Sequence, residues 1–175
     1  SASGIPKRAL EAYAGAAIAK ATQMPQCALG WTTLAGIGFA ESDHGRHGGS
    51  RVRDDGTVVP PIYGVALNGE GTAQVPDSDS GAIDGDPAAD RAVGPMQLIP
   101  QAWRNWHVDA GGDGREDPQN IDDAVTAAAN YLCRASADMA GAEGWRAGIA
   151  AYNASGVYRQ AVADAANRYA AAALR

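Results

Sequence analysis

The chain has no cluster of basic residues and no long apolar run. Its 175 residues include 14 Lys and Arg against 20 Asp and Glu, which gives a formal net charge of −6. A protein that binds nucleic acid neutralises phosphates with a surface rich in Lys and Arg, so we expect no nucleic-acid partner. No stretch of about 18 uncharged apolar residues occurs, so we also expect no membrane span.

Cysteine is scarce as well, with two residues in the whole chain. Cys27 and Cys133 lie far apart, which argues against a zinc ribbon or a redox pair. In an exported protein they would form a disulfide between the end of an early helix and a late helix. Two buried free thiols are the alternative.

What the chain does contain favours one mainly helical domain over residues 1–175. Hydrophobic residues make up 46%, but alanine, a strong helix former, dominates them, and only one Phe is present. The length is enough for a single domain to bury its own core. The 22 Gly and 9 Pro must occupy substantial loops.

Apolar residues repeat at helical spacing at both ends of the chain. The first helical section runs from Pro6 to about Asp43, with a break at residues 23–25 and a second helix from about Trp31. The later helices are expected to begin at Pro100, after the cap-like pair Asp117-Pro118, near Trp145 and near Val157.

Residues 46–93 form a long insertion that is rich in Gly, Asp and Pro. Only 57–59 and 62–67 resemble strands, and the acidic run 77–86 is expected to be mobile or associated with an ion. A loop of this length inside a small domain is typically functional or disordered. We expect it to form one wall of a cleft.

Glu41 is the most informative single residue. It lies four positions after Ile37 and seven after Leu34, so a helix places its carboxyl on an apolar stripe. Burial, and in second place the negative end of the helix dipole, would then raise its pKa. A proton held near neutral pH is what a general acid for glycosidic cleavage requires. The alternative is a helix-end Glu that simply points to solvent.

Four motifs occur in a fixed order: Glu41-Ser42, residues 94–100 (GPMQLIP), residues 117–124 (DPQNIDDA) and Ala151-Tyr152-Asn153. Together they resemble the lytic murein transglycosylases of the lysozyme-like superfamily, particularly the secreted branch related to the membrane-bound B type. The resemblance spans about residues 5–155. Met96 stands where many relatives have Phe, and the smallest relatives lack the acidic loop.

The resemblance implies a lysozyme-like fold in which Glu41 is the acid/base and Ser42 supports the end of its helix. Met96 and Gln97 would line the cleft floor, and Tyr152 and Asn153 would contact the sugar. Gln97 offers donors and an acceptor to an acetamido group, and Tyr152 offers a flat face with a polar tip. Met96 as a core residue and Tyr152 as a packing aromatic are the alternatives.

The implied reaction needs one carboxylate. Glu41 would protonate the glycosidic oxygen of the MurNAc–GlcNAc bond and then take the proton of the C6 hydroxyl, leaving a 1,6-anhydro end. We expect an exported monomer that acts on peptidoglycan strands without a cofactor, although the printed sequence opens without a leader. The alternatives are a muramidase or chitin-type hydrolase on the same fold, and a binding domain without turnover.

Two groups of residues resemble metal sites only in part, and we expect no metal at either of them. Asp43, His44 and His47 follow the proposed catalytic helix but have no further ligand nearby in sequence. Residues 109–120 fit the spacing of a calcium loop only in part, so we expect a turn there instead. Among the four tryptophans, Trp103 and Trp145 are expected to pack between helices, and one exposed Trp could stack on sugar.

Overall fold

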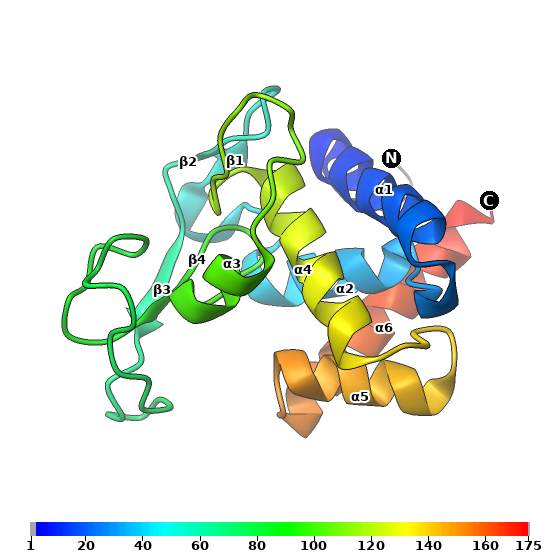
Figure 1. Ribbon diagram of the computed structural model, residues 1–175. Helices are drawn as coiled ribbons and strands as arrows, with labels where there is room; N and C mark the ends of the chain where they lie inside the picture. The colour runs from blue at the N-terminus through cyan, green and yellow to red at the C-terminus, as the bar shows by residue number, and fades with distance from the viewer. Residues whose placement is uncertain (1–2, 175) are drawn as a thin grey trace.

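The computed structural model describes residues 3–174, which separate into a helical side and a side of short strands and long loops (Figure 1). Both ends of the described chain lie on the helical side. The helices are α1 (Lys7–Gln23), α2 (Trp31–Ser42), α3 (Pro100–Trp106), α4 (Ile121–Ala135), α5 (Ala142–Tyr152) and α6 (Gly156–Ala173), with single 3-10 turns at Pro25–Cys27 and His47–Gly49. The expected mainly helical class with a partly extended insertion is confirmed.

Two antiparallel ribbons form the strand side. β1 (Arg51–Val52) pairs with β2 (Val58–Val59), and β3 (Tyr63–Ala66) pairs with β4 (Arg91–Val93) across a register shift. The predicted strands at 57–59 and 62–67 are therefore confirmed as β2 and β3. Their partners β1 and β4 were not predicted, because two or three residues that include an arginine carry no alternating pattern of their own.

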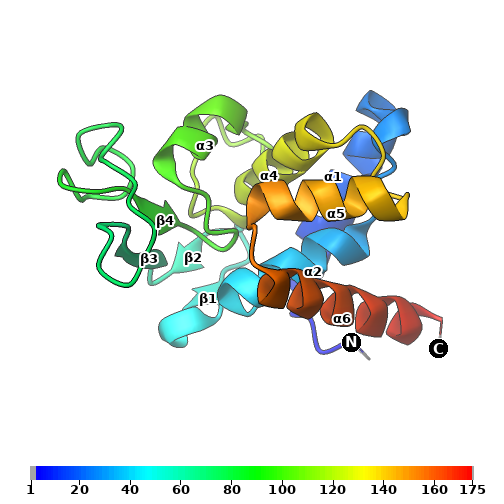
Figure 2. The same ribbon diagram turned by 90° about the horizontal axis from the view of Figure 1, so that it is seen from below.

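Helix α2 lies at the centre of the helical side and packs most extensively against α6 (Figure 2). Small residues make this close approach possible. A Cβ on Gly36 would lie only 2.7 Å from the carbonyl oxygen of Val162 on α6, closer than real Cβ contacts come. The alanine-rich core around it includes Tyr13, Leu34, Ile37 and Ile149, each without exposed surface. Small side chains therefore allow α2 and α6 to approach closely.

The start of α4 differs from the expectation. Helix α4 begins at Ile121, and its N-cap is Asn120, whose side chain accepts the backbone N–H of Asp122 (2.9 Å). The Asp117 carboxylate instead accepts the N–H of Gln119 (2.8 Å) in the preceding turn. The prediction that Asp117-Pro118 caps the helix was wrong, because Asp-Pro also suits a tight turn and local spacing does not separate the two uses.

The last helix begins at Gly156, close to the expected start near Val157. Ser155 caps α6, and its hydroxyl accepts the N–H of Tyr158 (3.3 Å). Val162 and Tyr169 are buried, whereas the apolar side chain of Val157 is 82% exposed and lies outside the buried face of the helix.

Two long-range links join the first part of the chain to α4. Cys27 and Cys133 form a disulfide, so the expected bridge is confirmed and the free-thiol alternative is excluded. Arg8 on α1 forms a salt bridge with Asp122 at the start of α4, and both side chains are mostly shielded from solvent. Between residues 3 and 174, no helix combines the length and apolar character needed to cross a membrane.

Removing the disulfide should destabilise the protein substantially. The bridge closes a loop with a sequence separation of 106 residues, which limits the entropy of the unfolded chain. We expect the Cys27→Ala/Cys133→Ala variant to lose about 3–5 kcal/mol of unfolding free energy in urea titrations. Wild-type protein in excess reductant should shift by a similar amount. Identical midpoints with and without the bridge would contradict this expectation.

Candidate active site

Glu41 lies on the last turn of α2 and is only partly exposed. The hydroxyl of Tyr158, in the first turn of α6, donates a hydrogen bond to its Oε1 atom (2.6 Å). Burial raises the pKa of the Glu41 carboxyl to about 7, and the hydrogen bond from Tyr158 lowers it by a smaller amount. The expected raised pKa is thus confirmed, and the carboxyl holds a proton over much of the range below pH 7.

Ser42 joins the end of α2 to the segment that follows the insertion. Its hydroxyl donates to the carbonyl oxygen of Pro95 (2.6 Å) and accepts the N–H of Gly45 (2.8 Å). The backbone between them is left-handed at Asp43 and His44, and Gly45 shares this conformation. The helix therefore ends at Ser42 rather than running on to Gly45, and the direction of the Glu41 turn is fixed by these bonds.

His44 lies in the core beneath this turn and is 1% exposed. Its Nδ1 shares a hydrogen bond with the hydroxyl of Tyr13 (3.0 Å), and its Nε2 shares one with the hydroxyl of Tyr169 (2.8 Å). Burial lowers the pKa of His44 to about 4, so the ring is neutral and can donate through one nitrogen and accept through the other. Both ring nitrogens of His44 are therefore occupied by tyrosine hydroxyls.

The segment 94–97 is held between α2 and α5. The Pro95 carbonyl accepts the Ser42 hydroxyl, and the Met96 carbonyl accepts the hydroxyl of Tyr152 (2.6 Å). Met96 has no exposed surface, so its side chain belongs to the core and only its backbone faces Tyr152. This placement matches the core alternative and not the expected position on the cleft floor. The side chain is unbranched and fills space under the segment.

Gln97 and Tyr152 line a cavity of about 180 Å³ between α3, α4 and α5. Gln97 has a left-handed backbone, and its amide donates to the carbonyl of Gly94 (3.0 Å) while the side chain stays partly exposed. Tyr131 closes the other wall, with its ring 5.7 Å from Tyr152 and its hydroxyl donating to the Ala151 carbonyl (2.7 Å). The expected neighbours Gln97 and Tyr152 are thus together.

An aromatic row continues from this cavity. The ring of Trp106 stacks on Tyr131 with centroids 6.2 Å apart, and it stays partly exposed. Trp103 is 5% exposed and packs in the core, as expected. Trp145 is partly buried and donates its indole N–H to the hydroxyl of Thr33 (3.1 Å). Trp106 is therefore the tryptophan that lies beside the cavity.

Asn153 and Tyr158, at the junction of α5 and α6, differ in how well the sequence predicts them. Asn153 caps the end of α5 and is exposed, and its side chain accepts the N–H of Ser155 (3.0 Å). Tyr158, which contacts Glu41 directly, was not predicted. Tyr158 packs against the main core as well as bonding to Glu41, and nothing in the neighbouring sequence marks it as a partner of that residue.

The insertion contains five acidic residues that could be candidates for a second carboxylate: Asp54, Asp55, Asp84, Asp86 and Asp90. The carboxylates of four of them accept backbone N–H groups within the insertion itself. These four are Asp55, Asp84, Asp86 and Asp90. Asp86 also forms a salt bridge with Arg91 (2.7 Å). Burial alone raises the pKa of Glu41, with no acidic residue among the causes. These carboxylates thus order the insertion.

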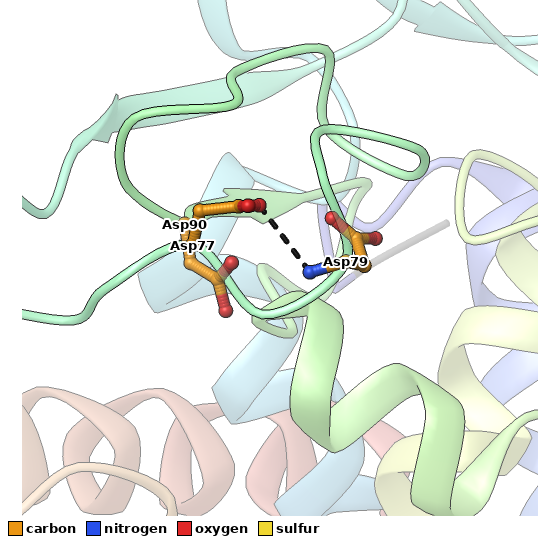
Figure 3. A group of neighbouring side chains, drawn as sticks. All are labelled: Asp77, Asp79 and Asp90. Atoms are coloured by element: carbon orange, nitrogen blue, oxygen red, sulfur yellow. Dashed lines mark hydrogen bonds between the residues drawn. The ribbon is translucent and has the colours of Figure 1, made fainter.

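Within residues 3–174, one group of carboxylates is close enough to hold a cation. Asp77, Asp79 and Asp90 bring ligand atoms within 4.8 Å of one another (Figure 3). Figure 3 also shows the hydrogen bond that the N–H of Asp79 donates to Asp77 (3.3 Å). Asp90 is fully buried and accepts both the N–H and the hydroxyl of Ser78. Turn-forming hydrogen bonds thus account for most of the cluster, and we assign it no metal.

In the loop 109–120, carboxylates also accept backbone N–H groups. Asp109 accepts three backbone N–H groups between residues 112 and 114, and Asp123 on α4 accepts those of Ala110, Gly111 and Asp117. The expected turn before α4 is therefore present. Its carboxylates are engaged with the backbone.

Comparison with known proteins adds one finding. Residues 80–148 match the family model described as Transglycosylase SLT domain. The match supports a relation to the lytic transglycosylases, whose substrate is peptidoglycan, and it fits the mainly helical, lysozyme-like fold. It covers less than half of the 175 residues and does not include Glu41. No curated protein and no solved structure was found to match the chain.

Replacing Tyr158 with Phe should raise the pKa of Glu41 further. The hydrogen bond from the tyrosine hydroxyl favours the charged carboxylate, and Phe removes it without changing the packing of the ring. We expect an upward shift of about half a unit to one unit in an NMR titration of the Glu41 side-chain carboxyl. Tyr63→Phe, at an exposed position in β3, serves as the control. An unchanged or lowered Glu41 titration in Tyr158→Phe would refute the interpretation.

The same burial makes stability depend on pH. A carboxyl whose pKa rises from 4.5 to about 7 on folding binds its proton more tightly in the folded state. Its contribution to the unfolding free energy is therefore lost as pH rises from about 4.5 to 7. We expect Glu41→Gln to be more stable than wild type by about 1–3 kcal/mol at pH 8, and by much less at pH 4. Glu70→Gln, in an exposed loop, should show no such difference; a gain for Glu41→Gln that is the same at both pH values would argue against the buried acid.

Proposed function

We propose that the protein is a lytic transglycosylase that cleaves the MurNAc-β-1,4-GlcNAc bond of peptidoglycan with Glu41 as its sole acid/base. The observation that carries the proposal is the partly buried Glu41 carboxyl, with a pKa of about 7 and one hydrogen bond from Tyr158. A group with that pKa can donate a proton and later accept one at the same pH. The family match supplies the substrate class.

The reaction runs in two proton transfers. Glu41 protonates the glycosidic oxygen, and the bond to the anomeric carbon of MurNAc breaks while the N-acetyl group of the same sugar stabilises the positive charge. The Glu41 carboxylate then removes the proton of the C6 hydroxyl, whose oxygen bonds to the anomeric carbon and closes the 1,6-anhydro ring. Atoms and charge balance without water and without a second carboxylate.

The state of the other acidic groups supports a single-carboxylate route. Carboxylates of the insertion accept backbone N–H bonds or pair with Arg91, so they are already used in holding the loop. A hydrolase of the usual kind needs a second carboxylate as nucleophile or as base for water. Asp84, Asp86 and Asp90 are not among the groups that shift the Glu41 pKa, so none of them serves as the second carboxylate in this proposal.

The substrate contacts in this proposal are Gln97, Tyr152 and Asn153, with Ser42 supporting the end of α2. Gln97 would bind an acetamido group at the cavity beside Tyr152, and the exposed Asn153 would contact the sugar near the scissile bond. Met96 would contribute through its backbone, because its side chain is fully buried. Tyr158 joins this set as the residue that adjusts the Glu41 pKa.

The proposal also includes the setting in which the enzyme works. The disulfide fits an exported protein, since such bridges persist in oxidising compartments. The order and spacing of the motifs favour the secreted branch related to the membrane-bound B type. We propose that the enzyme acts on the cell wall as a monomer and without a cofactor.

Digestion of purified sacculi tests the chemistry directly. We expect mass spectrometry to show 1,6-anhydro-MurNAc ends, each lighter by one water than a hydrolysis product. Glu41→Gln should lower the rate of lysis by at least about a thousandfold, because Gln keeps the shape but has no titrating proton. Circular dichroism should show an unchanged fold.

The other outcomes distinguish the alternatives. Products with only reducing ends would identify a muramidase on the same fold. Binding to sacculi without any lysis by the wild type would identify a binding domain. Full activity of a folded Glu41→Gln variant would remove Glu41 from the mechanism altogether.

A further inference from the structure

One groove of the described chain lies apart from Glu41, which is not among its lining residues. It has a volume of about 490 Å³ and lies between α5 and α6, beside the first turn of α2 (Figure 2). Five of its lining residues are alanines, among them Ala142 and Ala163, and Trp145 lines it as well. Alanine side chains leave room for a ligand backbone to come close to the helices.

Two guanidinium groups line this groove from opposite helices. Arg146 comes from α5 and Arg159 from α6. Within residues 3–174 neither side chain forms a hydrogen bond or a salt bridge, whereas Arg8, Arg46, Arg53 and Arg91 each pair with an Asp. Two guanidinium groups without a carboxylate partner, on the two helices that border one groove, favour an anionic ligand.

Uncharged polar groups accompany the two arginines. The amide of Asn167 and the hydroxyl of Thr32 line the same groove. An arginine fork binds a carboxylate through two parallel hydrogen bonds, and amide and hydroxyl groups suit peptide N–H and C=O groups. The combination of alanine surface, guanidinium and amide matches a short peptide that carries free carboxylates.

The groove is also within reach of Glu41. Arg159 directly follows Tyr158, whose hydroxyl is bonded to Glu41. Thr33, in the floor of the groove, lies eight residues before Glu41 on α2, a distance of about 12 Å along the helix axis. An extended peptide covers that distance with about four residues.

We propose that this groove binds the carboxylate-bearing peptide attached to the glycan strand, with Arg146 and Arg159 holding its carboxylates. This inference rests on the proposed function, because it takes the ligand from the same peptidoglycan that Glu41 cleaves. The peptide-binding groove lies beside the glycan site and makes cleavage faster on strands that still carry peptides.

Two forms of one substrate test the proposal: peptide-bearing glycan strands, and the same strands after an amidase has removed the peptides. For wild type we expect kcat/KM to be higher on the peptide-bearing form. In Arg146→Ala and in Arg159→Ala, the ratio of kcat/KM for the two forms should fall about five- to tenfold. Arg146→Lys should fall in between, because lysine keeps the charge but not the fork.

The matched control is Arg115→Ala, which removes the same charge from an exposed loop outside the groove. Its ratio should equal that of wild type. Calorimetry provides a readout without turnover: the peptide released by the amidase should bind Glu41→Gln, and binding should be lost when Arg146→Ala is added.

The outcomes separate the two proposals. A wild type that cleaves both forms equally well, or arginine variants that keep the wild-type ratio and still bind the released peptide, would overturn the groove proposal and leave Glu41 chemistry intact. A wild type that cleaves neither form would refute the proposed function, and the calorimetric result would still decide whether the groove binds the peptide.

Discussion

The arrangement of the site depends on one constraint, that the last turn of α2 cannot move its carboxyl into water. An ionised Glu41 would be more stable if the side chain were free to reach solvent, since burial raises its pKa to about 7. Ser42 is bonded to Pro95 on one side, and His44 is bonded to two buried tyrosines on the other. These bonds fix the backbone that directly follows the acid, so the carboxyl is held in its buried position by the packing around the end of α2.

The segment 94–97 is the second fixed point, and it joins the helical side to the strand side. Gly94 has a positive φ of 73°, and a Cβ there would overlap the carbonyl of Pro118, so only glycine fits. The adjoining Pro95 and Met96 carbonyls accept hydroxyls from α2 and α5. The position of Gln97 relative to Glu41 therefore follows from hydrogen bonds to the backbone of this segment.

Periodicity predicted what depends on local sequence, and it failed where partners are distant. The start of α2 and the stripe from Leu34 to Glu41 follow from apolar spacing, and the disulfide partner was available because only two cysteines exist. The strand partners β1 and β4 were missed, because short polar strands are defined by their neighbours. The same reason explains Tyr158. Its contact with Glu41 spans 117 residues of sequence, and no local pattern encodes a contact of that range.

In the proposed reaction Glu41 acts first as an acid and then as a base, and the Tyr158 hydroxyl bears on both steps. Burial alone would raise the Glu41 pKa above the value of about 7, since the hydrogen bond from Tyr158 lowers it. A higher pKa would make the carboxyl a weaker proton donor in the first step. A lower pKa would leave less of the protonated acid to start the reaction, and it would weaken the carboxylate as a base in the second step. One donor opposing desolvation keeps both forms accessible near neutral pH, and a second carboxylate beside Glu41 would disturb this balance by raising the pKa again.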